Sequence, residues 1–151
     1  MATTCALCGA ALAPGETCRD RFDATLALEI ENPSAYGAVH HLSVLCYMLQ
    51  HNAYSRAAWP AARQLLHEFV HDGLTATQAR RRNRTRFDNE HRSWSVTQGA
   101  RLPGVGTVAW TRTMADVRVD TVEQYCADVR DWARAVLADT ATIARQYDSE
   151  T

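Results

Sequence analysis

The sequence predicts a mainly α-helical protein, a bundle of about five helices in a single domain of residues 1–151. Apolar residues recur three and four positions apart in several stretches, which is typical of amphipathic helices. Helix start and stop signals separate these stretches. A chain of 151 residues is also long enough to bury about two-thirds of its unfolded surface in one domain.

Residues 1–19 are predicted to be a loop, because turns at Gly9 and Pro14-Gly15 leave too little chain for periodic structure. A first helix is expected over 20–31. Its apolar residues lie at helical spacing and are Phe22, Leu26, Ala27 and Ile30. Asn32-Pro33 ends this helix, since the residue before a proline is disfavoured in the helical region.

The second expected helix contains the most apolar stretch of the chain, residues 39–51. It begins at Ser34 or at the Tyr36-Gly37 pair and ends near His51. From residue 39 onward it lacks Gly and Pro and is apolar almost all round, as expected of a helix surrounded by other helices. We expect it to form an antiparallel hairpin with the first helix.

Two further helices are expected before residue 92. Ser55 can cap the third, which reaches about residue 72 before Gly73, and a start at 59–60 is the alternative because Pro60 suits a first turn. Thr75 and Gln78 form a capping box that opens a fourth, Arg-rich helix to about residue 87.

The C-terminal third is expected to be irregular and then helical. In 93–119, Gly and Pro interrupt short alternating runs, which indicates irregular structure or a small hairpin near 93–113. One last helix is expected over 120–148. Its continuous apolar stripe consists of Val122, Cys126, Val129, Ala133, Val136, Thr140, Ile143 and Tyr147.

The composition of the chain argues against several classes of protein. The chain has no Lys, so it has no Schiff-base chemistry of its own. No apolar run approaches the roughly twenty residues that span a bilayer. The first residues also lack the basic and apolar regions of a signal peptide. We therefore expect a cytoplasmic protein without a membrane segment, whose odd number of five cysteines argues against disulfides.

Three cysteines near the N-terminus predict a zinc site. Cys5 and Cys8 have the two-residue separation of a zinc knuckle, and Gly9 permits the tight turn. Cys18 supplies a third thiolate after a nine-residue loop. The alternatives are free thiols or a redox pair, although no βαβ pattern follows the motif. A tetrahedral zinc site needs one more ligand.

The fourth ligand is expected to be a histidine of the second helix. His40 and His51 are eleven residues apart, roughly 16 Å along a helix, so one zinc ion cannot bind both. A hairpin that turns near Pro33 places Cys18 opposite residues 48–51, which favours His51. The predicted zinc ligands are Cys5, Cys8, Cys18 and His51.

The other cysteines and histidines have simpler interpretations. Cys46 and Cys126 lie on apolar stripes and are expected to be small core residues. His40 and His41 are expected to be hydrogen-bonded or partly exposed. His67 and His71 are one turn apart, as a metal pair would be, but the acidic residues beside them favour a solvated face.

The N-terminal third also resembles a known family. The motif residues are Cys5-x-x-Cys8-Gly9-Ala10, a single Cys18 before a helix, Tyr36 shortly before His40, and Tyr47-x-x-Gln50-His51. In this combination residues 5–52 resemble a bacterial family of small proteins catalogued as a domain of unknown function. The resemblance implies that the three cysteines and both histidines are pattern positions, so His40 stays a rival fourth ligand. It implies no activity.

Three functions are compatible with these features. A structural zinc site would support a binding or accessory role toward an unidentified protein or small molecule. A small zinc-dependent hydrolase is the alternative, although three thiolates make zinc a poor Lewis acid. Residues 75–112 carry eight Arg and two acidic residues, and the Arg80–Arg92 stripe with Trp94 and Trp110 suits nucleic acid. Such a stripe is more often a solvated face, here with the acidic last helix as an internal partner.

Overall fold

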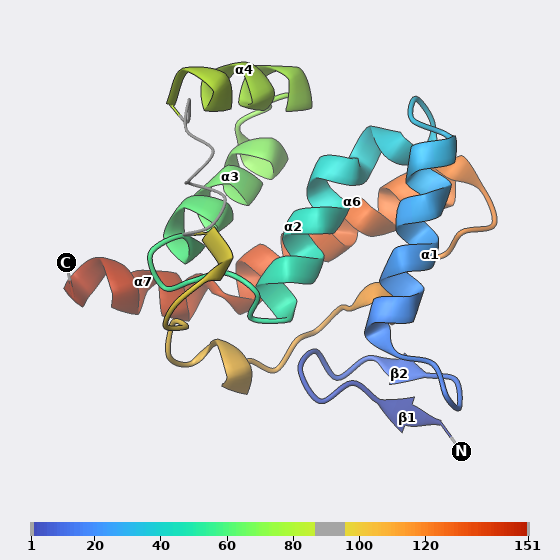
Figure 1. Cartoon of the computed structure of the whole chain (residues 1–151), viewed down its shortest axis with the longest axis horizontal. Helices are drawn as coiled ribbons and strands as arrows, with labels where there is room; N and C mark the ends of the chain where they lie inside the picture. Colours follow the sequence, from blue (N-terminus) through green and yellow to red (C-terminus); the bar gives the residue numbers. More distant parts are fainter. Residues whose placement is uncertain (1, 87–95, 151) are drawn as a thin grey trace.

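A computed structural model describes residues 2–86 and 96–150 and confirms the mainly α-helical fold (Figure 1). Helix α2 lies at the centre and packs against three others, in agreement with its apolar sequence. The four packed helices are α1 (Cys18–Glu31), α2 (His40–Gln50), α3 (Trp59–His71) and α6 (Val122–Asp139). Helices α4 (Ala76–Arg86) and α7 (Ala141–Glu150) extend from the ends of α3 and α6.

The N-terminal segment contains a short antiparallel hairpin that the sequence did not predict. Strand β1 (Thr3–Thr4) pairs with β2 (Ala11–Leu12). The Gly9 N–H donates to the Cys5 carbonyl at 2.9 Å, and the Cys5 N–H donates to the Ala10 carbonyl at 2.9 Å. Gly9 has φ +78°, which only glycine adopts without strain. This turn connects β1 to β2 and contains both Cys5 and Cys8.

Helix α1 begins two residues earlier than expected and buries a more polar face. Thr17 and Asp20 form a capping box, with N–H to oxygen distances of 3.0 and 3.1 Å. Ile30, predicted to be part of the apolar stripe, is 72% exposed, so that part of the prediction was wrong. Glu29 beside it is 2% exposed. The inward face of α1 is therefore set by residues 18, 22, 25 and 29.

The connection from α1 to α2 produces the expected antiparallel hairpin (Figure 1). After Pro33 the chain forms the 3₁₀ helix η1 (Tyr36–Val39), which continues directly into α2. Gly37 lies against the end of α1, and its own N–H donates to the Asn32 carbonyl at 2.9 Å. A Cβ at Gly37 would lie 2.7 Å from the backbone carbonyl oxygen of Glu29.

Replacement of this glycine should destabilise the hairpin. We expect Gly37→Ala to lower the free energy of unfolding by about 1–3 kcal/mol, because the added methyl meets backbone that cannot rotate away. Urea denaturation measures the loss. Gly106→Ala is the matched control, since a Cβ there meets nothing within 4 Å. Equal stability of the two variants would contradict the close approach seen here.

Helices α3 and α4 begin at the predicted signals. The alternative start of α3 is confirmed, with Pro60 in the first turn and the Trp59 N–H donating to the Ser55 carbonyl at 2.9 Å. The capping box of α4 is also confirmed. The Thr75 N–H donates to Gln78 Oε1 at 2.9 Å, and the Gln78 N–H donates to Thr75 Oγ1 at 3.1 Å.

The segment between α4 and α6 is irregular where the structure describes it. Residues 96–113 contain no strand, and two short 3₁₀ helices follow one another, η2 (Val105–Thr107) and η3 (Met114–Asp116). Gln50 of α2 fastens this segment to the bundle. Its Nε2 donates to the Arg112 carbonyl at 2.6 Å, and its Oε1 accepts from Trp132 Nε1 at 3.0 Å. The buried amide is thus satisfied on both sides.

The last helix is divided, where the sequence predicts a continuous one. Between α6 and α7, Thr140 Oγ1 donates to the Val136 carbonyl at 2.7 Å. Arg63 of α3 reaches the same place, where Nη2 donates to the Leu137 carbonyl at 2.8 Å and Nε donates to Thr140 Oγ1 at 2.8 Å. These bonds satisfy carbonyl groups left free where α6 ends. The apolar stripe itself is confirmed from residue 126 to residue 143, where its members are buried.

None of the helices in the described part of the chain has both the length and the apolar content that a membrane crossing requires.

Candidate metal centre

The structure brings the four residues Cys5, Cys8, Cys18 and His51 together. Their ligand atoms all lie within 4.8 Å of one another. Cys5 Sγ is 3.7 Å from His51 Nε2, and Cys8 Sγ is 3.5 Å from Cys18 Sγ. Ligands of one tetrahedral zinc ion lie about 3.5–3.8 Å apart, given the usual zinc–sulfur and zinc–nitrogen bond lengths. The cluster could therefore hold a metal ion with little movement.

Three elements deliver these side chains to one end of the α1–α2 hairpin (Figure 1). Cys5 and Cys8 lie in the turn between β1 and β2. Cys18 is the first residue of α1, directly after its N-cap. His51 is the C-cap of α2. Because α1 and α2 are antiparallel, the start of one meets the end of the other, and the β1–β2 turn covers that junction.

Neighbouring groups fix the orientation of His51. Its Nδ1 lies 2.7 Å from the carbonyl oxygen of Tyr47, which can only accept, so Nδ1 carries the proton. Nε2 is then left with a lone pair that faces the sulfurs. The ring stacks on Tyr47 with centroids 4.0 Å apart, and Tyr47 stacks on Phe22 at 3.9 Å. A backbone partner of this kind orients a histidine ligand.

Burial governs the protonation of the cluster. It lowers the pKa of His51, against the opposing effect of the hydrogen bond to Tyr47, so the imidazole is neutral near pH 7. Burial also raises the pKa of Cys8 and of Cys18, and the neighbouring sulfurs raise that of Cys18 further. Burial acts in the same direction on Cys5, but backbone hydrogen bonds from residues 7 and 8 hold its pKa below the usual value. A bound cation would favour all three thiolates.

His40 lies away from this cluster. It is the first residue of α2, at the opposite end of the helix from His51. Its side chain is half exposed, and Nδ1 donates to Glu29 Oε1 at 3.1 Å, which confirms the interpretation of a hydrogen-bonded, partly exposed histidine. The five cysteines form no disulfide, and Cys46 and Cys126 are buried as predicted.

His67 and His71 on α3 are not joined by enough further ligands to form a metal site among the described residues. The rings of His67 and His71 have centroids 4.8 Å apart, and His67 Nδ1 is 3.7 Å from a carboxylate oxygen of Asp72. Within 2–86 and 96–150, no second group of three or more candidate ligands lies close enough for one ion. The solvated-face interpretation agrees with the exposure of these side chains.

One arginine of the basic stripe pairs with α3: Arg82 Nη1 is 2.6 Å from Glu68 Oε2. The predicted pairing of the stripe with the acidic last helix stays a prediction, because most of the stripe lies outside the described residues. Arg80 and Arg81 are exposed. The side chains of residues 83–86, and the whole of 87–95 with Arg92 and Trp94, lie outside the described residues.

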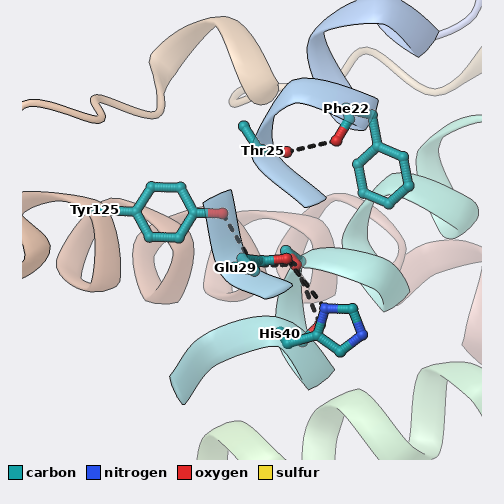
Figure 2. Close-up of polar contacts among 6 residues, drawn as sticks. Phe22, Thr25, Glu29, His40 and Tyr125 are labelled. Atoms are coloured by element: carbon teal, nitrogen blue, oxygen red, sulfur yellow. Dashed lines mark hydrogen bonds and ion pairs between the residues drawn. The ribbon is translucent and has the colours of Figure 1, made fainter. Parts of the chain in front are cut away.

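A second polar cluster, around Glu29, was missed by sequence reasoning (Figure 2). The Glu29 side chain is 1% exposed. Ser43 Oγ donates to both carboxylate oxygens at 2.8 and 3.0 Å, and Tyr125 OH donates to Oε2 at 2.9 Å. Figure 2 shows Tyr125 and His40 on two sides of the carboxyl group. Burial and the Glu29 charge raise the pKa of Tyr125, so its phenol stays a donor.

One sequence signal could have revealed this cluster. Residues 18, 22, 25 and 29 follow helical spacing, so Glu29 lies on the same face as Cys18 and Phe22. A carboxylate on a face already assigned to the core requires buried donors. In this fold they come from α2 and α6, one of them 96 residues away in sequence.

Comparison with known proteins identifies a family. A model described as "Family of unknown function (DUF5946)" matches residues 3–141, which include all four clustered residues. No curated protein and no solved structure matches the chain.

Proposed function

This chain belongs to the family of unknown function DUF5946, and we propose that its function depends on one structural zinc ion bound by Cys5, Cys8, Cys18 and His51. The observation that carries the proposal is the convergence of three Sγ atoms and one Nε2 atom within 4.8 Å. Four protein ligands complete a tetrahedral zinc site and leave no position for water or substrate.

The donor set favours zinc over other cations. Thiolate and imidazole ligands suit zinc, whereas magnesium and calcium prefer oxygen ligands. A knuckle turn followed by one cysteine and one histidine is a usual arrangement for structural zinc. The neutral state of His51 and its fixed Nε2 lone pair also suit coordination.

The ion would hold the N-terminal hairpin against the helices. Strands β1 and β2 have two residues each, and a hairpin that short is not stable alone in water. Zinc would link it to the start of α1 and the end of α2. In small zinc peptides, metal binding contributes on the order of 10 kcal/mol to folding, and a domain with its own core needs less.

A closed zinc site supports a binding or accessory role in preference to catalysis. The partner would be a protein or a small molecule. A small zinc-dependent hydrolase remains the alternative, but it would need a ligand position open to water. Three thiolates donate so much charge that the zinc would activate water poorly. The three ligand thiols must also stay reduced, which suits the cytoplasm.

Metal analysis tests the proposal directly. We expect the purified protein to contain one zinc per chain by elemental analysis. Zinc-edge X-ray absorption should give three sulfurs at about 2.3 Å and one nitrogen at about 2.0–2.1 Å. His40→Gln is the matched control and should leave the spectrum unchanged, because His40 lies at the other end of α2. An oxygen in place of one of these ligands would support the hydrolase instead.

A further inference from the structure

A hollow of about 500 Å³ lies at the end of α2 opposite the metal centre. Its lining comes from the end of η1, the start of α2, the end of α3, the start of α4 and the middle of α6. Figure 1 shows how these helices are arranged. The apolar lining residues that are partly exposed are Phe69, Val70 and Leu74, whereas Val39 and Leu42 are buried. The volume falls within the usual range for small-molecule sites, about 300–1,000 Å³.

The rim of this hollow is positively charged. Arg130 and Arg134 of α6 both line it, and no acidic residue does among the residues that the structure describes. Arg134 Nη1 is 3.0 Å from a carboxylate oxygen of Asp131. Arg130, in contrast, forms no ion pair with any described residue, although it is exposed at the edge of an apolar concavity. Among the described residues that line the hollow, Arg130 is therefore the arginine without an ion pair.

His41 also lines the hollow and lies close to these positive charges. Its ring packs edge-on against Phe69 with centroids 4.5 Å apart. Burial lowers the pKa of His41, and the positive charges of His40, Arg130 and Arg80 lower it further. This direction agrees with the two arginines of the rim, whose guanidinium groups would attract an anion.

We propose that this hollow binds a small organic carboxylate with an apolar body, which Arg130 holds by its acid group. A guanidinium presents paired donors that match a carboxylate, and the apolar walls would cover a hydrocarbon chain. An inorganic anion would leave those walls in contact with water. The site does not depend on zinc, because it lies at the other end of α2 from residues 5, 8, 18 and 51.

Three probes of matched size or charge test the ligand class. In isothermal titration calorimetry with the full chain, we expect octanoate to bind at one site. Acetate, which has the acid group alone, should bind at least tenfold more weakly. Octyltrimethylammonium, which has the chain with a cation, should give no saturable heat. Equal binding of octanoate and octyltrimethylammonium would overturn the proposal, because the rim charge would then play no part.

Arginine variants locate the acid group. Arg130→Gln should weaken octanoate binding about tenfold, the loss expected for one charge-assisted contact of about 1.4 kcal/mol. Arg134→Gln should weaken it less, since Asp131 already pairs with that side chain. Arg145→Gln, on α7 and outside the lining, is the matched control and should bind as the parent does. Both α6 arginines are exposed, so these variants should fold.

A signal from His41 separates this site from unspecific binding of an amphiphile. The His41 ring resonances should shift on titration with octanoate in the parent and in Arg145→Gln, but much less in Arg130→Gln. Unchanged His41 resonances at saturating octanoate would place the ligand elsewhere and overturn the proposal.

Discussion

Cys5→Ser should abolish metal binding and lower the melting temperature by about 10 °C or more. Loss of a structural metal is among the few single changes that cost about 4 kcal/mol or more. In a chain of this size, 1 kcal/mol corresponds to about 2–4 °C. Cys5 is chosen because its Sγ is the atom next to His51 Nε2, 3.7 Å away. Elemental analysis and differential scanning calorimetry of the purified variant measure the two effects.

A matched cysteine variant separates metal loss from thiol loss. Cys126 is buried in α6, and its Sγ contacts only the Ala35 carbonyl at 3.7 Å among the hydrogen bonds of the described residues. Cys126→Ser should keep the full metal content. A chelator should lower the melting temperature of the parent and of Cys126→Ser but leave that of Cys5→Ser unchanged. Full metal content in Cys5→Ser would refute the four-ligand site.

The sequence alone allowed the prediction that the four metal-site residues lie close together. The distance between Cys5 and Cys8 is set by a local turn. The pairing of Cys18 with His51 follows from the register of an antiparallel helical hairpin about its turn near Pro33. Both depend on the turn of one loop and on one pair of helices that are neighbours in sequence, and the structure places all four ligand atoms within 4.8 Å. The strands β1 and β2 could not be inferred, because two-residue strands carry no periodicity.

Features that depend on contacts between distant elements were the ones missed. The division of the last helix at Thr140 coincides with Arg63, which reaches the end of α6 from α3. Ile30 fits an apolar stripe by spacing, yet it is exposed while Glu29 is buried. The donors that allow Glu29 to be buried come from α2 and α6. A pattern within one helix does not contain such partners.

Helix α2 contributes residues to the metal cluster, to the Glu29 cluster and to the charged hollow. Its C-terminal end supplies His51 to the metal cluster, and its N-terminal end supplies His40 and Ser43 to Glu29. The same N-terminal end lines the charged hollow through His41. One buried helix therefore positions three polar sites along its length. We expect the metal cluster and the Glu29 cluster to contribute to stability independently, because they lie at opposite ends of α2.

Glu29→Ala tests that independence and should be the second most costly change. It removes the acceptor shared by Ser43, Tyr125 and His40. The buried Tyr125 hydroxyl then loses its carboxylate acceptor, whereas Ser43 Oγ keeps the His40 carbonyl at 3.1 Å. Removal of one member of a buried charged network costs about 3–5 kcal/mol, and the cavity adds to this. Tyr125→Phe removes one donor alone and should cost about 1–2 kcal/mol. Urea denaturation of both variants measures the two losses.

The isosteric variant shows which property of Glu29 matters. Glu29→Gln fills the same volume, but its amide nitrogen cannot accept from Ser43 or Tyr125, so its cost should fall between those of Glu29→Ala and Tyr125→Phe. All three variants should retain full metal content, since none touches the four clustered residues. Loss of the metal in Glu29→Ala would show that the two ends of α2 do not act independently. If Glu29→Ala cost no more than Tyr125→Phe, the Glu29 carboxylate would instead be a consequence of the fold and not one of its supports.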